Sequence, residues 1–383
     1  MRLLYVSSDP GVPILGHKGA SVHVRALVGA LAAHGAEVVV ASPRVGFEGE
    51  QMESSWLVEI DPVLPKSHES ERSLLEGVER QARQIGELAA GLAVDAIYER
   101  FSLFSDGGVA AAATLGVPHV LEVNAPLRRE AARFRTLPYP AVAEAIEQDV
   151  FDRTDRIFAV SSPLAELLTA AGVPAEKIQV VPNGIDVAAF RSLTPVRERH
   201  FTIGFAGSLK PWHGIDVLLE GFGLALAAEP GLRLEIVGAG PLAGLVASSR
   251  LPPERLVYHG QLTHEATIRA MVRWDVGVAP FAPLEDFYFS PLKVGEYMAA
   301  GACTVASDFP PIRDLLGHGE RGLLVEPGNA AALARAIVEM AQSRERAAAV
   351  GRLARAYALS TLGWSHNARR TLTALGEPVG ALR

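Results

Sequence analysis

Short apolar runs alternate with longer amphipathic stretches along almost the whole chain. In the first half, SVHVRALVGALAAHG predicts a helix that ends at Gly35, and buried strands are predicted at 3–7, 37–42, 96–100, 119–123, 156–161 and 178–183. In the second half, strands are predicted at 202–207, 233–238, 255–260, 276–281, 303–307 and 322–327. Strands that alternate with helices indicate parallel βαβ units, and runs without a polar face indicate a sheet covered on both sides.

The two series are similar in size and style, and residues 187–199 between them follow neither pattern. We interpret 187–199 as a linker. The pattern therefore predicts an α/β protein with two doubly wound, Rossmann-like domains facing a central cleft. We place an N-terminal domain at 1–190, a second domain at 200–358 and a final helical segment at 359–383.

Composition narrows the class of protein. With 383 residues, 49% of them hydrophobic, the chain can bury large cores, and a net charge of −7 argues against general nucleic-acid binding. The single cysteine excludes an intrachain disulfide framework and a cysteine-based zinc site. The apolar start of the chain is interrupted after Val6, and no apolar run reaches about 18 residues, so we expect a cytoplasmic protein without a signal peptide or membrane span.

Ligands of such sheets bind beyond the carboxyl ends of the strands, which directs attention to the loops there. The loop 10–21 carries Gly16 and Gly19 but lacks the G-x-G-x-x-G spacing, which disfavours a nicotinamide or flavin cofactor. In GFAGSLKPWHG (204–214), two glycines bracket Ser208, Lys210 and His213, an arrangement that suits a pyrophosphate. The alternative is a solvated Lys210 beside a packing tryptophan.

The stretch SPLKVGE (290–296) holds the sharpest feature. Ser290 and Pro291 predict a helix start and Gly301 its end, so Lys293 lies in the first turn. A helix N-terminus favours acidic residues, and a lysine there is explained if an anion binds at this end. Glu296 shares the face of Lys293 and would accept hydrogen bonds from ligand hydroxyls. The alternative is an i,i+3 ion pair worth a few tenths of a kcal/mol, about the usual size of such pairs.

Weaker signals lie elsewhere. The turns around Gly238 and Gly260–Gln261 end apolar runs and could present backbone groups to a ligand, a base in the case of Gly260–Gln261. Arg100 ends a predicted strand and suits an anion or acceptor contact. The stretch 127–137 gathers four arginines around a phenylalanine. It is interpreted as a solvated helix, with an acceptor-binding element or a peripheral contact with the inner membrane face as alternatives.

Together these motifs resemble the retaining glycosyltransferases of family 4, which have the GT-B fold. The resemblance rests on the order of VVPNGIDVAAF, GSLKPWHGIDVLLEGF, LEIVGAGP, SPLKVGEYMAAGACTVAS and GERGLLVEPGN. It implies an acceptor-binding N-terminal domain, a C-terminal domain that binds a nucleotide-diphosphate sugar as co-substrate, and a last helix near Trp364 that crosses back to the first domain. Further cofactors are not implied. The acceptor would be a sugar, a lipid-linked molecule or a small molecule, and the oligomeric state is left open.

The resemblance and the residues together define a predicted site. The predicted catalytic residues are Lys210, Lys293, Glu296 and Arg100, and no metal ligand is predicted. The predicted donor-binding residues are Gly19, Ser208, His213, Gly238, Gly260, Gln261, Ser290, Leu292, Lys293 and Glu296. The predicted acceptor-binding residues are Lys18, Arg100 and Asn124.

The chain also departs from the family pattern. Glu296 matches the second of the family's paired glutamates, but Tyr288 occupies the position of the first, which contacts the donor sugar in the family. Ser208 and His213 stand where the family has an arginine and a lysine, and Arg100 where a histidine is common. Lys210 and Lys293 are hypothesised to supply the missing charge.

The implied reaction is transfer of a sugar with retention and without a metal, in which the leaving phosphate takes the acceptor's proton. Alternatives are a nucleotide-sugar epimerase of the same fold, a hinged two-domain solute-binding protein, and a nucleotide-sugar binder with degenerate catalysis.

Overall fold

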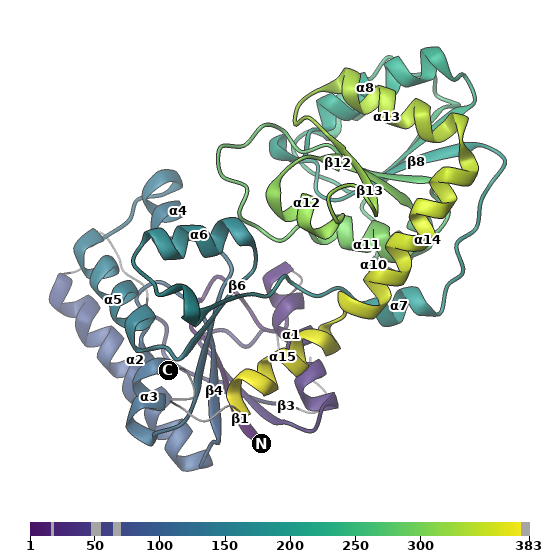
Figure 1. The fold of residues 1–383 in the computed structure, drawn as a ribbon. Coiled ribbons are helices and arrows are strands. Elements are labelled where there is room, and N and C mark those ends of the chain that lie inside the picture. Colours follow the sequence, from purple (N-terminus) through teal and green to yellow (C-terminus); the bar gives the residue numbers. More distant parts are fainter. Residues whose placement is uncertain (17–18, 47–54, 64–69, 377–383) are drawn as a thin grey trace. The chain divides into compact units, whose positions relative to one another are not determined.

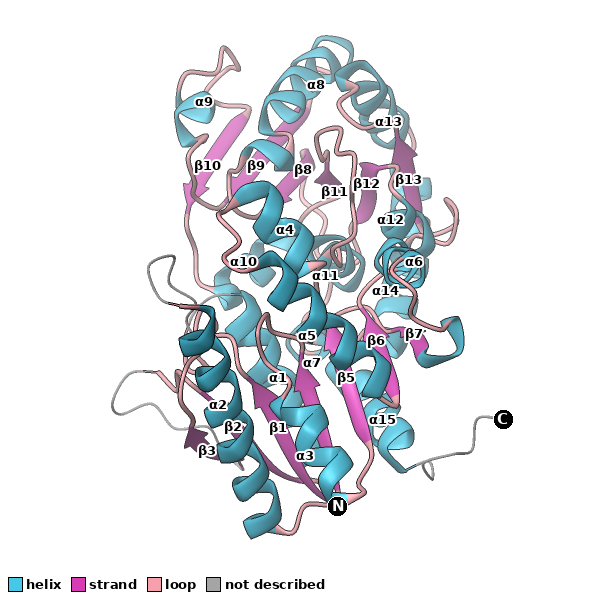
Figure 2. Ribbon diagram, turned by 90° about the vertical axis from the view of Figure 1, so that its left-hand side faces the viewer, coloured by secondary structure: helices cyan, strands magenta, loops and turns pink. Residues whose placement is uncertain are grey.

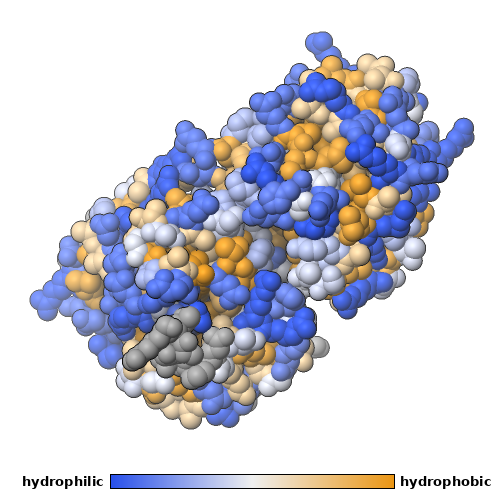
Figure 3. All heavy atoms as spheres, in the orientation of Figure 1, coloured by the Kyte–Doolittle hydropathy of each residue, from blue (hydrophilic) through white to orange (hydrophobic). Residues whose placement is uncertain are grey.

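The computed structural model describes residues 1–16, 19–46, 55–63 and 70–376. These residues form two compact units, one of Met1–Gly184 with the C-terminal segment from Trp364, the other of Ile185–Gly363. In each unit, helices surround the strands of a sheet (Figure 1). In the face shown in Figure 3, hydrophilic residues cover most of the surface of both.

Unit 1 holds a parallel sheet of seven strands in the order β3-β2-β1-β4-β5-β6-β7. The strands are β1 (Arg2–Ser7), β2 (Glu37–Ser42), β3 (Ser55–Glu59), β4 (Ala96–Arg100), β5 (His119–Val123), β6 (Arg156–Ala159) and β7 (Ile178–Val180). The helices are α1 (Gly19–Ala33), α2 (Glu71–Leu92), α3 (Gly107–Leu115), α4 (Leu127–Phe134), α5 (Pro140–Arg153), α6 (Ser162–Ala170) and α15 (Trp364–Gly376). The strand order matches a doubly wound fold whose direction of winding reverses at β1.

The apolar runs of this sheet are explained by burial on both faces. Leu3 and Tyr5 of β1 pack in a core with α1 and α15, whereas Leu4 and Val6 pack in a second core with α2 and α3. Figure 2 shows the strands of this sheet and the helices around it. Alternate residues of a strand point to opposite faces, so each needs an apolar side chain. The helix α15 lies against α1, and Trp364 meets the His23 ring edge-on at 4.7 Å.

Unit 2 holds a parallel sheet of six strands in the order β10-β9-β8-β11-β12-β13. The strands are β8 (Phe201–Ala206), β9 (Leu232–Val237), β10 (Leu256–Gly260), β11 (Val276–Ala279), β12 (Cys303–Ser307) and β13 (Gly322–Val325). The helices are α7 (Val187–Arg191), α8 (Ile215–Ala228), α9 (Ala243–Ala247), α10 (His264–Met271), α11 (Leu292–Ala300), α12 (Pro310–Leu315), α13 (Ala330–Gln342) and α14 (Arg344–Thr361).

The segment interpreted as a linker begins with α7 and packs into unit 2. Phe190 is fully buried there, and the guanidinium of Arg355 on α14 donates hydrogen bonds to the carbonyls of Phe190 and Leu193. An arginine fork that binds two carbonyls fixes a short segment that has few backbone partners of its own. The segment therefore extends the second unit.

Candidate active site

A pocket of about 540 Å³ lies within unit 2, beyond the carboxyl ends of β8, β9 and β10. Strand order reverses beside β8, and such a switch point is where doubly wound sheets bind ligands. The lining residues are Ala206, Gly207, Ser208, Val237, Gly238, Ala239, Gln261, Leu262, His264, Thr267, Met271, Leu292, Lys293 and Glu296. Six predicted donor-binding residues are thus brought together: Ser208, Gly238, Gln261, Leu292, Lys293 and Glu296.

Two glycine turns form one wall of the pocket. Gly207 has a φ of +146° and Gly238 a φ of +135°, a region that side chains disfavour. A Cβ atom on Gly238 would lie 1.9 Å from the carbonyl oxygen of Gly207. The ends of β8 and β9 therefore meet backbone to backbone, and they leave peptide groups accessible to a ligand.

The helix α11 forms the opposite wall, and its start differs from the prediction. It begins at Leu292 after Pro291, whose ψ of 69° is not helical, and the structure records no side-chain cap at this end. Pro291 therefore precedes the helix as its N-cap residue, a place that the sequence assigned to Ser290. The first turn closes by a tighter bond from the Val294 N–H to the Pro291 carbonyl, at 3.0 Å. Gly301 ends the helix with a φ of +76°, as predicted.

Tyr297 fastens α11 to the end of β8. Its buried hydroxyl accepts a hydrogen bond from the Ala206 N–H at 2.8 Å and donates one to the Ala206 carbonyl at 3.2 Å. Burial raises the pKa of this phenol. The two bonds fasten the second turn of α11 to the end of β8, and Lys293, one turn earlier, lies against the glycine turn that follows Ala206.

Lys293 places a buried amine beside the pocket. Part of its stem lines the pocket, while Nζ is buried and finds no hydrogen-bond partner among the described residues. Nζ lies 4.3 Å from the centroid of the Phe205 ring and 5.2 Å from that of Phe281. Burial lowers the pKa of the amine to about 7, against a smaller opposing effect of Glu296. Aromatic faces compensate only part of the cost of burying a cation.

Glu296 lies one turn after Lys293 and pairs with His264 at the start of α10, a residue that sequence reasoning missed. The imidazole Nε2 lies 3.3 Å from Oε1 of Glu296. This hydrogen bond raises the pKa of His264. The Glu296 side chain is 24% exposed, so its carboxylate can still accept hydrogen bonds from a ligand.

Lys210, the lysine of the loop after β8, does not line the pocket. Lys210 Nζ lies over the ring of the exposed Trp212, 4.8 Å from its centroid, and Lys210 is not among the described residues that line the pocket. His213 Nδ1 is hydrogen bonded to the Ser208 carbonyl. Burial first and Lys293 second lower the pKa of His213 to about 4, so its ring is neutral near pH 7.

The remaining predicted donor-binding residues are not among the described residues that line this pocket. Gly260 ends β10 and precedes Gln261, and Ser290 precedes α11. Tyr288 lies in a loop where its ring meets Phe289 edge-on at 6.1 Å. Gly19 belongs to unit 1, as the first residue of α1. Lys18 falls outside the described residues.

Unit 1 gathers a second polar cluster at the carboxyl ends of β4 and β5. Glu122 is buried, and it binds His23 at 2.8 Å, the Tyr98 hydroxyl at 2.6 Å and the Arg100 guanidinium at 3.1 Å. The amide of Asn124 also donates to Glu122. Burial works to raise the pKa of Glu122, but His23, Arg100 and Tyr98 outweigh it and lower the pKa to about 2. Two predicted acceptor-site residues, Arg100 and Asn124, therefore share one carboxylate.

The arginine-rich stretch forms α4, a short helix without a buried residue. Phe134 is 68% exposed, with the Arg133 guanidinium 5.3 Å from its ring centroid. Arg128 pairs with Glu144 and Glu147 of α5. No helix in the described part of the chain is long and apolar enough to cross a membrane.

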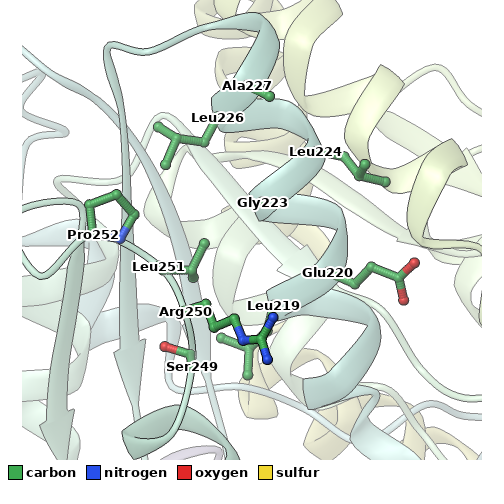
Figure 4. A pocket seen from close by; sticks show the side chains of 10 residues that line it. All are labelled: Leu219, Glu220, Gly223, Leu224, Leu226, Ala227, Ser249, Arg250, Leu251 and Pro252. Atoms are coloured by element: carbon green, nitrogen blue, oxygen red, sulfur yellow. The ribbon is translucent and has the colours of Figure 1, made fainter.

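A second hollow of unit 2, about 600 Å³, lies between α8 and residues 249–252 (Figure 4). Leu226 and Leu251 approach Pro252 there, whereas Glu220 points away from them. Polar groups do not converge in it as they do in a specific ligand site. In the residues described, no group of three or more His, Cys, Asp or Glu side chains could hold a metal ion.

Comparison with known proteins decides between the possible classes. A model of Glycosyltransferase Family 4 matches residues 17–189, and a model of Glycosyl transferases group 1 matches 200–343. The chain belongs to glycosyltransferase family 4. It is therefore a transferase of the class that moves glycosyl groups, as the resemblance predicted.

One relative of this family 4 glycosyltransferase matches nearly its whole length, and another matches a little under half of it. A D-inositol 3-phosphate glycosyltransferase of Paenarthrobacter aurescens is 27% identical over 98% of this chain and 96% of its own. A phosphatidyl-myo-inositol mannosyltransferase of Mycobacterium tuberculosis is 34% identical over 45% of this chain and 48% of its own.

Solved structures support the fold. Anabaena HepE, crystallised with UDP, has a TM-score of 0.71 at 19% identity and covers 98% of this chain and 100% of its own. A glycosyltransferase of Rickettsia africae has a TM-score of 0.73 at 16% identity and covers 99% of both chains. At these identities the likeness shows the fold alone, and it confirms the predicted class of two Rossmann-like domains of the GT-B type.

One of the residues that sequence reasoning missed in this glycosyltransferase, Glu122, had a usable signal. Glu122 stands inside the apolar run HVLEV, and a buried carboxylate requires partners. That requirement points to cationic or hydroxyl side chains on neighbouring elements, here His23 and Tyr98. His264 follows Thr263, which caps α10, and no comparable signal marks it.

Proposed function

We propose that this protein transfers a sugar, with retention of configuration and without a divalent metal, from a nucleotide-diphosphate sugar to an acceptor hydroxyl. The observation that carries the proposal is the unit 2 pocket, in which a half-buried carboxylate, Glu296, faces two glycine turns at a strand switch point. Such a pocket offers hydroxyl recognition on one side and close backbone approach on the other. HepE, which shares the fold, was crystallised with UDP and with UDP-glucose.

The donor is assigned to this pocket by the chemistry of its parts. Glu296 would accept hydrogen bonds from the ribose hydroxyls, the strand ends near Gln261 would meet the base, and the diphosphate would lie at the start of α11. A helix N-terminus presents free N–H groups to an anion. Tyr297 holds that end in place before the ligand arrives.

The reaction then needs stabilisation of the departing diphosphate above all. The bond between the anomeric carbon and the phosphate oxygen breaks, and the acceptor oxygen attacks from the same face. The acceptor's proton passes to the phosphate oxygen that leaves. Fixed dipoles and a cation at the diphosphate lower the barrier because negative charge develops there, and they do so without a metal.

The acceptor is assigned to unit 1. Arg100 and Asn124 lie at the carboxyl ends of the strands, and Glu122 holds both in position. The inositol-based names of the relatives are consistent with an acceptor that carries several hydroxyl groups. We propose a polyhydroxylated acceptor, free or lipid-linked.

A thermal-shift screen with UDP, GDP, ADP and their sugars tests the donor assignment. We expect one nucleotide to raise the melting temperature of the wild type and to lose most of this effect in E296Q. The matched control is E265Q, because Glu265 is an exposed carboxylate of α10 paired with Arg269. If no nucleotide stabilises the wild type, or if E296Q responds like E265Q, the donor assignment is wrong.

With the identified donor and an inositol acceptor, proton NMR of the product reports the anomeric configuration. Retention in the presence of EDTA is the expected result. Inversion, a requirement for metal, or epimerisation of the donor without an acceptor would each contradict the proposal.

A further inference from the structure

The amine of Lys293 has an unusual environment for a lysine at a helix start. Nζ lies against the backbone of Gly207, so close that a Cβ at that position would be 2.8 Å from it. Two phenylalanine rings flank it, and the described residues provide it with no hydrogen-bond partner. A buried ammonium without an anion is costly, so the site is incomplete as it stands.

The usual sources of positive charge at this place are missing from the chain. Ser208 and His213 occupy the positions at which the family resemblance leads us to expect an arginine and a lysine. His213 is neutral, and its Nδ1 is occupied by the Ser208 carbonyl. Lys210 lies over Trp212. Among the described residues that line the pocket, Lys293 is the one lysine or arginine.

We propose that the cation that binds the donor's diphosphate in this enzyme is Lys293, in the first turn of α11, and not a residue of the loop after β8. When the diphosphate binds, the amine of Lys293 takes up a proton and becomes charged. This inference rests on the proposed function, since it assumes a nucleotide-diphosphate ligand in the pocket. The amine and the free N–H groups of α11 would then contact the same anion. The lysine stem is flexible, which allows Nζ to turn from the Phe205 face toward the pocket.

The charges around Nζ make proton uptake a specific signature. Glu296 is the acidic group that favours the charged form of Lys293. Glu296 also pairs with His264, and Asp186 is a further acidic group that raises the pKa of His264. Two further titratable groups belong to this region, Lys210 and the neutral His213, and both Lys293 and Lys210 lower the pKa of His213. With a pKa of about 7 in the free protein, most Lys293 amines are neutral at pH 8. A diphosphate favours the ammonium, so binding at pH 8 takes up a proton and weakens as the pH rises.

Isothermal titration calorimetry in buffers of different ionisation enthalpy measures this uptake. The ligand is the nucleoside diphosphate that stabilises the wild type in the thermal-shift screen, and the proteins are wild type, K293M, K293R and K210M. At pH 8 we expect the wild type to take up nearly one proton more than K293M does. We expect affinity in K293M to fall by roughly 10- to 100-fold, the usual range for one charge-assisted bond. His264 is present in every variant, so its contribution cancels in the difference.

The variants separate a binding role from a structural one. K293R carries a permanent charge, and we expect it to bind the nucleotide without the extra proton uptake. K210M should match the wild type in affinity and in uptake. If K293M binds with wild-type affinity and the same uptake, or if K210M shows the loss instead, the inference is wrong while the donor assignment stands. If the wild type binds no nucleoside diphosphate, the proposed function itself is wrong.

Discussion

Replacing Lys293 by methionine should make the ligand-free protein more stable. Burial lowers the pKa of this amine from 10.5 to about 7. At about 1.4 kcal/mol for each pH unit, this corresponds to a cost of about 5 kcal/mol when Lys293 is charged in both states. Relaxation of the site reduces the cost, and we take roughly 3 kcal/mol as the working value. Methionine keeps the length of the stem and removes the amine, so K293M relieves the cost.

The pH dependence identifies the cause. Below about pH 7, the folded and unfolded states both carry the proton and the cost is complete. Between about pH 7 and 10.5, the unfolded state binds more protons, so the wild type gains stability as the pH rises, by up to about 1.4 kcal/mol for each pH unit. The stability difference between K293M and the wild type should therefore be largest near neutral pH and shrink above pH 8.

Calorimetric melting at pH 6.5, 7.5, 8.5 and 9.5 measures this difference. For a unit of this size, roughly 3 kcal/mol shifts the melting temperature by roughly 6–12 °C. K210M serves as the control, since Lys210 is exposed and lies over Trp212. Saturating nucleotide should narrow the difference by about 1.4–2.7 kcal/mol, the free-energy equivalent of the 10- to 100-fold loss of affinity expected in K293M. A K293M protein that is less stable than the wild type at pH 7, or a difference that does not change with pH, would refute the reasoning.

Three further predictions concern residues other than Lys293. Glu122→Gln should lower the stability of unit 1 by roughly 3–5 kcal/mol at pH 7, because it leaves Arg100 and His23 buried without their carboxylate. Since the pKa of Glu122 is about 2 in the folded state, the wild type should lose this advantage as the pH falls from about 4.5 toward 2, and acid unfolding curves of both proteins should converge there. Gly238→Ala should cost more than about 2 kcal/mol and abolish nucleotide binding, since its Cβ would meet the Gly207 carbonyl in a backbone region with positive φ; Gly231→Ala, with open space around it, should be nearly neutral in melting and binding assays. The His264 imidazole should titrate above its ordinary pKa of 6.5 in an NMR titration and return toward it in E296Q, and an unchanged midpoint would contradict the pairing of the two side chains.

Much of the fold follows from apolar periodicity. Twelve of the strands coincide with predicted runs, and most of these twelve are buried on both faces, where apolar side chains are favoured at nearly every position. The strand β3 was not predicted, since it is an edge strand paired with β2 whose apolar run is the three residues WLV. An edge strand needs fewer apolar side chains, and its signal is correspondingly weak.

The candidate site was predictable where a residue breaks a local rule. A lysine in the first turn is unfavourable for the helix dipole, and in the structure Lys293 is a buried amine beside a pocket. The exact start of α11 was not predictable, because Ser290 and Pro291 fit two helix registers equally well. Lys210 carries the same charge as Lys293, but its direction depends on Trp212, a contact that spacing alone does not determine.

The pairing of His264 with Glu296 was not predictable from the sequence. The role of His264 depends on α10 and α11 lying side by side, and its distance from Glu296 is 32 residues in sequence. Glu122 in unit 1 was predictable in part. The sequence shows that this buried carboxylate needs partners, but only the arrangement of the strands and helices around the sheet shows which residues these are.

The most direct measurement is the crystal structure of the protein with the nucleoside diphosphate that stabilises it. We expect the diphosphate at the start of α11, with a phosphate oxygen about 3 Å from Lys293 Nζ and a ribose hydroxyl at a similar distance from the Glu296 carboxylate. A diphosphate bound to Lys210, or a nucleotide outside the unit 2 pocket, would contradict it.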